Sequence, residues 1–416
     1  MELRRVVVTG LGAITPIGNN VPDYWSGLLG GVSGAGEITR FDASKFKCRI
    51  ACEVKNFDPL QFFDRKEARK LDSYAQFAIV AADEAIADSG IDKDNTDFDE
   101  VGVIFASGIG GISSLYEDMK DFATGDGVPR LSPFIIPRLL PDIAAGHISI
   151  KHGFHGVNFA TVSACASSAN ALIEGFNYIH FGKADVIVTG GSEASICPVG
   201  VGGFEATKAL STRNDDPKTA SRPFDANRDG FVMGEGAGCL ILEELNHALA
   251  RNAKIYGEII GAGVSADAHH ITAPHPEGLG AVLSMKRALK DAGITPEMID
   301  HINTHGTSTP MGDIAEILAI KEVFGGHTPK ISINSGKSMT GHLLGGAGAI
   351  ESISTILACK NDVVPPTINH FTDDPNIDPN IDFTFGTPRK RPVNYAISNA
   401  FGFGGHNASI VFKKYQ

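Results

Sequence analysis

The sequence has little of what marks several protein classes. Six cysteines occur in 416 residues and none lies in a CxxC pair, so a reducing, cytoplasmic compartment is expected rather than a disulfide framework. No apolar run approaches the ~18 residues of a membrane span. The start, MELRRVVVTGLG, has an apolar run too short for a signal peptide. The formal net charge of −12 argues against a general nucleic-acid or anionic-membrane role.

Metal and nucleotide motifs are also incomplete. TGLGAITPIG begins like a dinucleotide loop, but its third glycine comes late and a proline interrupts it. SGKS lacks the first glycine of a phosphate loop, because position 331 is Ile331, and GGSEA lacks the second glycine of a nucleophile elbow. His269, His270 and His275 have no zinc-ligand spacing and are interpreted as loop histidines. We therefore expect no metal and no bound cofactor.

The residues that are present predict an α/β protein. Short β-branched runs alternate with helical patterns such as 75–90 and 278–293. The predicted strands include 4–10, 101–108, 157–164, 184–191, 238–245, 254–264, 300–306, 330–336, 381–386 and 407–414. The length of 416 residues exceeds one ordinary hydrophobic core, which indicates two domains or two fused halves.

A weak internal repeat in the sequence indicates two copies of one structural unit. EAIADSGID (84–92) resembles RALKDAGIT (287–295), and each is a helix end with a glycine, followed by an apolar strand that ends in glycine. A further strand and a helix of small residues come next in each half. We predict a duplicated α/β unit, with halves 1–252 and 253–416 that share one packed body.

Cys165 is the candidate nucleophile. It stands in ATVSACASSANAL, between a predicted strand and a predicted helix, among small residues that leave room for a substrate. A thiol at a helix N-terminus faces unpaired N–H groups, and this placement can lower its pKa. Free cysteine is more often a small buried hydrophobe, so the remaining residues of the pocket have to decide between the two interpretations.

Two histidines follow strands of the second half. His305 lies in NTHGTSTPMGD after one strand, and Lys337 and His342 lie in NSGKSMTGHLLGGAGAIE after another. Because α/β proteins place their sites at the carboxyl ends of strands, we expect these histidines and Cys165 to share a pocket. NAFGFGGHN (399–407) is interpreted as a tight turn before the last strand.

These motifs together resemble the β-ketoacyl-acyl carrier protein synthases, the elongating condensing enzymes of fatty acid synthesis, and most of all their type II group. The resemblance covers essentially the whole chain, including GVGGFEATKALSTRNDDPKTASRPFDANRDGFVMGEGAG. It implies the thiolase fold, a duplicated α/β unit in five α-β-α-β-α layers, and a homodimer. The implied reaction joins an acyl-enzyme thioester to malonyl-acyl carrier protein, with loss of CO₂, to give 3-oxoacyl-acyl carrier protein.

The resemblance also implies catalytic roles. Cys165 would accept the acyl chain, and His305 and His342 would stabilise the enolate left when malonyl loses CO₂. Lys337 would support the histidines electrostatically. Phe403 would be the gate beside the nucleophile, and its backbone N–H would join that of Cys165 as an oxyanion hole.

Substrate contacts are implied in the same way. Thr307 and Thr309 match threonines that bind the phosphopantetheine arm, with Thr272 nearby. Ile109, in SGIGG, matches a residue lining the acyl pocket. Glu351 is a carboxylate on the helix after His342 and is grouped with the substrate site. The phosphopantetheine arrives on the acyl carrier protein, so no resident cofactor is implied.

A basic surface is expected for the acidic acyl carrier protein. The segment 64–70 places Lys66, Arg69 and Lys70 on one face of a predicted helix, and Lys208 is a further contact near the pocket mouth. A solvated charged helix is the alternative for 64–70.

Three departures and two alternative functions stay open. Ser163, Ala166 and His406 differ from the usual family residues, and His406 adds an ionisable group near the gate. A thiolase-like coenzyme A enzyme would carry a second cysteine in the C-terminal glycine-rich turn, which NAFGFGGHN lacks. A non-catalytic partner subunit would replace the nucleophile, which this chain keeps. An acyl-transfer assay separates these possibilities.

Overall fold

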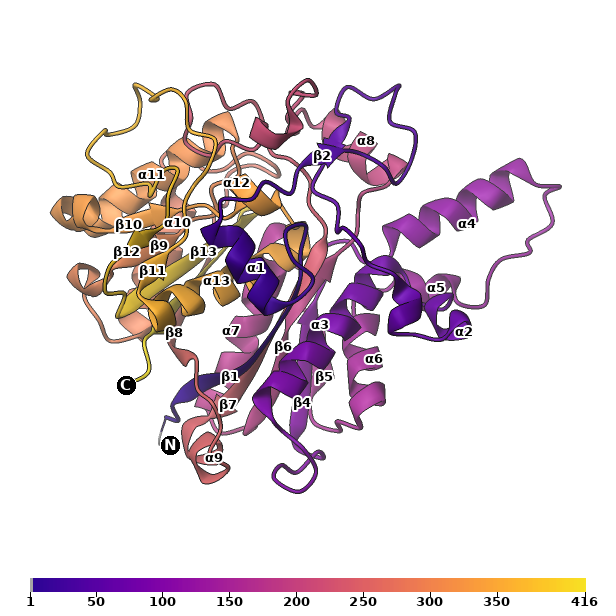
Figure 1. Ribbon diagram of the computed structural model, residues 1–416, viewed down its shortest axis with the longest axis horizontal. Coiled ribbons are helices and arrows are strands. Elements are labelled where there is room, and N and C mark those ends of the chain that lie inside the picture. Colours follow the sequence, from indigo (N-terminus) through magenta and orange to yellow (C-terminus); the bar gives the residue numbers. More distant parts are fainter. Residues whose placement is uncertain (1–2) are drawn as a thin grey trace.

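A ten-stranded sheet organises the computed structural model, which describes residues 3–416 (Figure 1). Its strand order is β10-β9-β13-β14-β8-β1-β7-β6-β4-β5. The first half of the chain supplies β1 (Val6–Ile14), β4 (Val101–Ala106), β5 (Asn158–Phe159), β6 (Val186–Glu193) and β7 (Gly236–Glu244). The second half supplies β8 (Gly257–Ala266), β9 (His301–Asn303), β10 (Ser332–Asn334), β13 (Tyr395–Gly402) and β14 (His406–Lys413).

The two halves have the same strand pairing. In the first, β7 lies antiparallel to β1 and β6, and β4 lies parallel to β6 and β5. In the second, β14 lies antiparallel to β8 and β13, and β9 lies parallel to β13 and β10. The duplication predicted from the internal repeat in the sequence is therefore present. Strand β1 of the first half pairs with β8 of the second half, so both halves belong to one continuous sheet. The exact boundary between 1–252 and 253–416 stays a prediction.

The two halves of the sheet form two β layers. One pair of helices lies between these layers, and one further pair covers the outer face of each. The outer pairs are α3 (Ser73–Ser89) with α6 (Ile143–His152), and α10 (Leu279–Asp291) with α11 (Pro310–Phe324). The central pair is α7 (Ser167–His180) with α13 (Ala347–Asn361). Three separate apolar clusters hold the strands to the first outer pair, the central pair and the second outer pair, which gives five layers.

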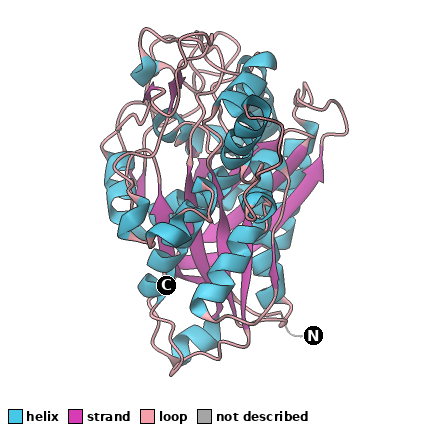
Figure 2. Ribbon diagram, turned by 90° about the vertical axis from the view of Figure 1, so that its right-hand side faces the viewer, coloured by secondary structure: helices cyan, strands magenta, loops and turns pink. Residues whose placement is uncertain are grey.

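The strands are apolar on both faces because both faces are covered. All nine residues of β1, VVVTGLGAI, are buried, as expected for a strand between two helical layers. Figure 2 shows the strands between helices, with the long loops gathered at the end of the molecule opposite both termini. This end is where β4, β6, β9 and β10 finish and where a site is expected.

The remaining elements are shorter and lie around the layers. They are α1 (Val21–Leu29), α2 (Arg65–Ala68), α4 (Ile112–Thr124), α5 (Ile135–Leu139), α8 (Pro198–Ala206), α9 (Leu245–Ala250), α12 (Lys337–Thr340) and the strand pairs β2 (Gly36–Glu37) with β3 (Ile50–Ala51) and β11 (Val363–Val364) with β12 (Arg389–Lys390). In Figure 1, α4 and the loop after it project from the body.

The central helices touch closely at their N-terminal ends. A side chain at Gly348 would place its Cβ 2.7 Å from the backbone nitrogen of Ala169, so only glycine permits this contact. The hydroxyl of Ser168 accepts a hydrogen bond from the N–H of Ala349 at 3.0 Å. The two halves are thus joined directly beneath the loops that carry the candidate site.

Several sequence predictions of local structure are wrong. Within 157–164 only Asn158–Phe159 forms a strand, because the chain turns early to form the Cys165 loop. Segment 381–386 makes only isolated bridges, at Asp382 and Phe385. By contrast, the tight turn predicted within 399–407 is confirmed, because Phe403–Gly405 form the turn of the hairpin that leads into β14, and the flanking residues belong to the ends of β13 and β14.

Candidate active site

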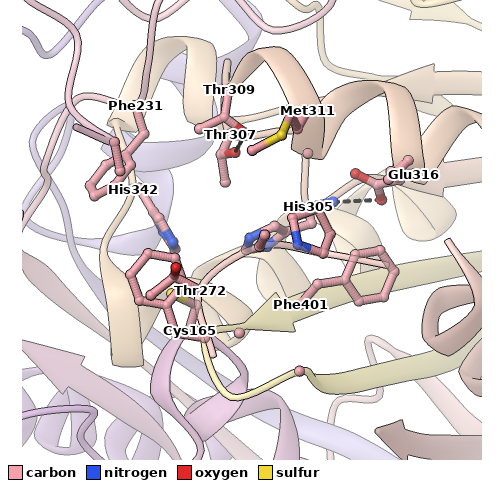
Figure 3. A pocket seen from close by; sticks show the side chains of 18 of the residues that line it. Cys165, Phe231, Thr272, His305, Thr307, Thr309, Met311, Glu316, His342 and Phe401 are labelled. Atoms are coloured by element: carbon pink, nitrogen blue, oxygen red, sulfur yellow. Dashed lines mark hydrogen bonds between the residues drawn. The ribbon is translucent and has the colours of Figure 1, made fainter. Parts of the chain in front are cut away.

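One cavity brings together residues from both halves. It has a volume of 350 Å³ and is lined by Cys165, His305 and His342, among others. Cys165 comes from the turn before α7, His305 from the loop after β9, and His342 from the segment between α12 and α13. Figure 3 shows these three side chains around one space, with Thr307, Thr309 and Met311 on its opposite side. The predicted clustering of one cysteine and two histidines is present.

The Cys165 turn has an unusual backbone held by a serine. Ala164 has φ 51°, a left-handed conformation that costs energy for a residue with a side chain. The Ser167 hydroxyl accepts a hydrogen bond from the N–H of Ser163 at 2.9 Å and donates one to the carbonyl of Ala164 at 2.6 Å. A 3₁₀ turn over Ala164–Ala166 then leads into α7. The small hydroxyl residues of SACASS therefore shape the turn that presents the thiol.

The expected low pKa of the thiol is wrong for this structure. Cys165 is only 8% exposed, and burial raises its pKa to about 12. The charge of Lys337 and the backbone N–H groups of Phe403 and Cys165 act in the opposite direction. The resting group is therefore a thiol, and its attack on a thioester requires a neighbouring base to accept the proton.

The end of β13 lies directly against the nucleophile turn. A Cβ at Gly402 would lie 2.8 Å from the carbonyl oxygen of Ser163 and 3.1 Å from the nitrogen of Cys165. This glycine lets the N–H of Phe403 reach the thiol. The Phe403 ring is half-buried, and its centroid lies 6.2 Å from that of Phe204. Two backbone N–H groups therefore face the sulfur, and Phe403 lines the same cavity.

A buried carboxylate fixes the His305 loop. Glu316, on α11, accepts hydrogen bonds from the N–H of His305 at 2.9 Å and of Gly306 at 2.8 Å. Burial raises the pKa of Glu316 to about 7. The His305 Nδ1 is buried without a hydrogen-bond partner in the described part of the chain. The ring is thus placed through its backbone and not through its side-chain nitrogen.

The His342 side chain is oriented by the next turn. Its Nδ1 accepts a hydrogen bond from the N–H of Leu344 at 3.3 Å, so the neutral ring carries its proton on Nε2. The His305 and His342 rings are 5.2 Å apart between centroids, at 85°. Two imidazoles can therefore direct N–H groups at one substrate oxygen.

Burial and a neighbouring cation keep both histidines neutral. The pKa values of His305 and His342 lie well below the ordinary value because of burial, with a further lowering by the charge of Lys337. Lys337 pairs with Glu351, and both side chains are almost fully buried. Burial raises the pKa of Glu351 to about 7.

The structure corrects the placement of Glu351. Glu351 lies behind the histidines in contact with Lys337 and does not line the cavity, so it is not a substrate contact. Lys337 is likewise outside the cavity lining. Its influence on the histidines is electrostatic, through buried surroundings in which charge acts strongly.

The predicted substrate contacts divide between two places. Thr272, Thr307, Thr309 and Lys208 line the cavity, and the hydroxyls of Thr307 and Thr309 lie 3.0 Å apart. Ile109 does not line it but packs against the apolar cluster that contains Cys165. The acyl pocket would therefore lie on the far side of the thiol from the threonines.

The basic segment 64–70 is exposed but forms little helix. Only Arg65–Ala68 is helical, and Arg69 and Lys70 follow in a turn, so the predicted shared helical face is wrong. Asp64 caps the start of this single turn and Asp72 caps the start of α3, so only the three residues 69–71 lie between the turn and the next cap. Lys66, Arg69 and Lys70 are all exposed and lie outside the cavity lining.

Comparison with known proteins gives the family. Residues 3–248 match the family described as "Beta-ketoacyl synthase, N-terminal domain" and residues 256–371 match "Beta-ketoacyl synthase, C-terminal domain". The chain belongs to the β-ketoacyl synthase family. The predicted resemblance and the condensing acyltransferase activity are thereby confirmed.

Relatives in this family match over their full length. A 3-oxoacyl-[acyl-carrier-protein] synthase 2 of Synechocystis sp. is 52% identical, over 100% of this chain and 99% of the relative. The protein of the same description from Coxiella burnetii is 47% identical, over 100% and 99%. A solved structure of a type II PKS acyl-carrier protein in complex with its ketosynthase, bound to the hexaketide, has 34% identity and a TM-score of 0.90, over 100% of both chains. The thiolase fold predicted from sequence is confirmed.

Two buried glutamates of the synthase site escaped the sequence analysis. Glu316 holds the His305 loop, and Glu193, at the end of β6, holds the loop that carries Ile109. Glu316 stands among apolar residues in IAEILAI, whereas Glu193 ends β6 directly after the residues TGGS. A carboxylate within an apolar run is a signal of buried hydrogen bonding, and it could have directed attention to Glu316.

The described residues show neither a metal cluster nor a membrane-spanning helix. Within residues 3–416, no group of three or more histidine, cysteine, aspartate or glutamate side chains is placed to hold a metal ion. No described helix combines the length and the apolar character needed to cross a membrane.

Proposed function

We propose that this synthase divides its reaction between the two halves of the cavity. Cys165, from the first half, carries the acyl chain, and His305 and His342, from the second half, stabilise the enolate formed from malonyl thioester. The observation that supports this proposal is that all three side chains line one cavity of 350 Å³. The product is a 3-oxoacyl thioester on acyl carrier protein, formed during fatty acid elongation.

Acyl transfer is the first step. The Cys165 sulfur attacks the carbonyl carbon of the acyl thioester, and its proton passes to the neutral imidazole of His305, since both nitrogens of His342 are already occupied. The oxyanion that forms is stabilised by the N–H groups of Cys165 and Phe403. The carbon–sulfur bond to the pantetheine breaks, and the departing thiolate takes up the proton.

Decarboxylation and condensation follow. The bond between the malonyl carboxylate and the adjacent carbon breaks, and its electron pair moves to the thioester oxygen as CO₂ leaves. The His305 and His342 N–H groups donate to this oxygen. The enolate carbon then attacks the acyl-cysteine carbonyl, and the cysteine sulfur leaves as a thiolate, which takes up one proton from solvent to restore the resting thiol. The thioester itself accepts the electrons, so the proposed reaction uses no metal and no resident cofactor.

Thr307, Thr309 and Thr272 are the proposed contacts for the phosphopantetheine arm. They line the cavity away from the Ile109 cluster, which leaves the arm on one side of Cys165 and the acyl chain on the other. Their hydroxyl groups match the amide and hydroxyl chemistry of the arm. Replacing Thr307 or Thr309 by valine is expected to raise KM for both acyl and malonyl substrates with a smaller change in kcat.

Acyl carrier protein is the proposed partner. A similar ketosynthase forms a complex with its acyl-carrier protein. Exposed Lys208 stands at the cavity, and Lys66, Arg69 and Lys70 are further exposed cations on a chain whose net charge is −12. A local basic surface would offset repulsion between two acidic proteins and speed their association.

A homodimer is the proposed assembly. No residue of α4 is buried, and α4 and the segment after it expose Met119, Phe122, Val128, Leu131, Phe134 and Ile136. An unpartnered apolar face of this kind indicates a protein contact. Sedimentation equilibrium should give twice the chain mass, and Phe122→Glu with Ile136→Glu should shift it towards the monomer.

The cytoplasm is the proposed compartment. This rests on the sequence argument that six cysteines without CxxC spacing suit a reducing environment. Fractionation of cells that produce the tagged protein tests it.

One experiment tests the proposed division of labour. Purified protein is incubated with an acyl thioester, and the adduct is located by mass spectrometry. An adduct on Cys165 is expected. A non-catalytic partner subunit would give no adduct, and a thiolase-like enzyme would prefer coenzyme A thioesters and need no malonyl group.

A further inference from the structure

Glu193 is a buried carboxylate between the acyl-pocket loop and the His342 turn. It is 0% exposed and stands at the end of β6. Its Oε1 accepts hydrogen bonds from the N–H of Ile109 at 3.3 Å and from two serine hydroxyls, Ser107 at 3.2 Å and Ser195 at 3.3 Å. Its Oε2 accepts from the N–H of Gly108 at 3.0 Å and of Gly345 at 3.1 Å.

These donors come from opposite sides of the site. Gly108 and Ile109 belong to the loop after β4, in the half that carries Cys165. Gly345 belongs to the turn after His342, in the other half. A Cβ at Gly345 would lie 2.1 Å from the nitrogen of Gly108, so the two loops touch and share the one carboxylate.

The hydrogen bond to Gly345 affects the orientation of His342. The N–H of Leu344, the residue before Gly345, donates to His342 Nδ1 at 3.3 Å and fixes the proton on Nε2. Leu344 has φ 50°, a conformation that needs support from its surroundings. Glu193 supplies that support by holding the next peptide N–H.

We propose that Glu193 is a positioning residue that ties the acyl-pocket loop to the turn that orients His342. It touches no substrate, since it does not line the cavity. By holding both loops, it sets the direction of the His342 N–H relative to the acyl chain on Cys165. The inference rests on the proposed role of His342 in decarboxylation.

Replacement of Glu193 by glutamine tests the proposal, because it should slow decarboxylation and at the same time speed alkylation of Cys165. Glu193→Gln keeps the shape but turns one acceptor oxygen into an N–H₂ group that faces N–H donors, which should loosen the two loops. Decarboxylation of malonyl-acyl carrier protein should slow by at least about tenfold, as for a misdirected donor. The negative charge of Glu193 raises the pKa of the Cys165 thiol. Its removal should therefore lower that pKa and make alkylation of Cys165 by iodoacetamide faster at pH 8.

Unfolding would expose all six buried cysteines and speed the alkylation of every one of them. The local effect predicted here is therefore recognised by faster alkylation of Cys165 alone, while the other five cysteines stay as protected as in the parent. Glu193→Asp is the second variant and carries the test if glutamine prevents folding. It keeps the charge and shortens the reach, so decarboxylation should fall while alkylation of Cys165 stays within about twofold of the parent.

Glu243→Gln is the matched control. Glu243 is also 0% exposed, and it lies opposite Val186 at the far end of the β6–β7 pair, roughly 20 Å from Glu193 along the strand. It accepts from Thr9, His247 and Arg251. This variant should lower the Tm and leave the ratio of decarboxylation to alkylation unchanged.

The outcomes separate this proposal from the proposed function. Unchanged decarboxylation in a folded Glu193 variant, or parallel losses in both readouts, would overturn the positioning role. The His342→Ala variant is measured in the same assay. If it also keeps its rate of decarboxylation, the proposed function fails. If His342→Ala decarboxylates slowly while the Glu193 variant decarboxylates at the normal rate, only the positioning role is refuted.

Discussion

The turn that holds Cys165 has a counterpart in the other half, the turn that holds Gly345. Ala164 and Leu344 have φ values of 51° and 50°, and each begins a 3₁₀ turn that leads into a central helix, α7 or α13. In the first half the next residue is a thiol at the cavity. In the second it is a glycine whose N–H donates to Glu193. The same backbone thus presents the proposed nucleophile in one copy and orients His342 in the other.

The loops after β4 and β9 differ in the same manner. Two residues past β9 stands His305, and two residues past β4 stands Gly108, followed by Ile109. Both loops have backbone N–H groups bound to a buried glutamate, Glu316 for the first and Glu193 for the second. Each half therefore anchors this loop with a buried carboxylate, but from a different element, α11 for Glu316 and the end of β6 for Glu193. The side chains that the two loops present also differ, an imidazole at His305 and an apolar side chain at Ile109.

Loss of the nucleophile should give the largest effect. Cys165→Ala removes the covalent route, so acyl transfer should fall by at least about a thousandfold with the fold intact. Single-turnover loading with an acyl thioester, read by mass spectrometry, measures this. The other five cysteines are free and buried and serve as internal controls. If the main acyl adduct formed on any of these five cysteines, the Cys165 turn would not be the one that carries the nucleophile.

Replacing either histidine should impair decarboxylation more than acyl loading. His305→Ala or His342→Ala removes one donor to the developing enolate, so release of ¹⁴CO₂ from malonyl substrate should slow by about a hundredfold or more. Acyl loading should survive better, because the nucleophile turn and its oxyanion donors are untouched. Unimpaired CO₂ release in both variants would refute the assignment of this step to the second half.

Lys337→Met should change stability and the pH profile together. Lys337 is paired with buried Glu351, and breaking such a pair costs about 3–5 kcal/mol of the free energy of unfolding. Its charge lowers the pKa of both histidines, so its removal raises those pKa values. Because the neutral imidazoles are the active form, the acid limb of the decarboxylation profile should move to higher pH.

The double variant Lys337→Met with Glu351→Gln sharpens this test. It should recover part of the lost stability, since no unpaired carboxylate is left buried, but it should keep the shifted pH profile. A profile that returns to that of the parent would mean that Lys337 acts through packing alone.

The docking surface should give the smallest effect. Lys66→Glu with Arg69→Glu should raise KM for acyl carrier protein substrates severalfold, mostly at low salt, because exposed rim charges act mainly on association. Activity on short pantetheine thioesters should hardly change. Lys93→Glu with Lys290→Glu makes the same change of charge elsewhere on the exposed surface. Equal losses on both substrate types would show that segment 64–70 is structural.

The duplication could be predicted because the same order of helix, strand and glycine recurs in both halves. His305 follows β9 closely, but Cys165 lies six residues after β5 and His342 lies beyond α12. Position alone therefore could not assign the site, and the roles of the three side chains were implied by the resemblance of the motifs around them. The thiol pKa could not be predicted, since it depends on how closely β13 and the second half cover Cys165. Glu193 and Glu316 were missed because a lone carboxylate is ordinarily a surface residue, and only the fold shows which N–H groups surround it.

Release of CO₂ by the Cys165→Ala variant tests the division between the halves most directly. This variant keeps His305, His342, Lys337 and both glutamate anchors, and it is measured with malonyl-acyl carrier protein in the absence of an acyl donor. We predict that it still releases CO₂ and forms acetyl-acyl carrier protein, while it makes no 3-oxoacyl product. Loss of CO₂ release together with condensation would contradict the account, because decarboxylation would then require the thiol.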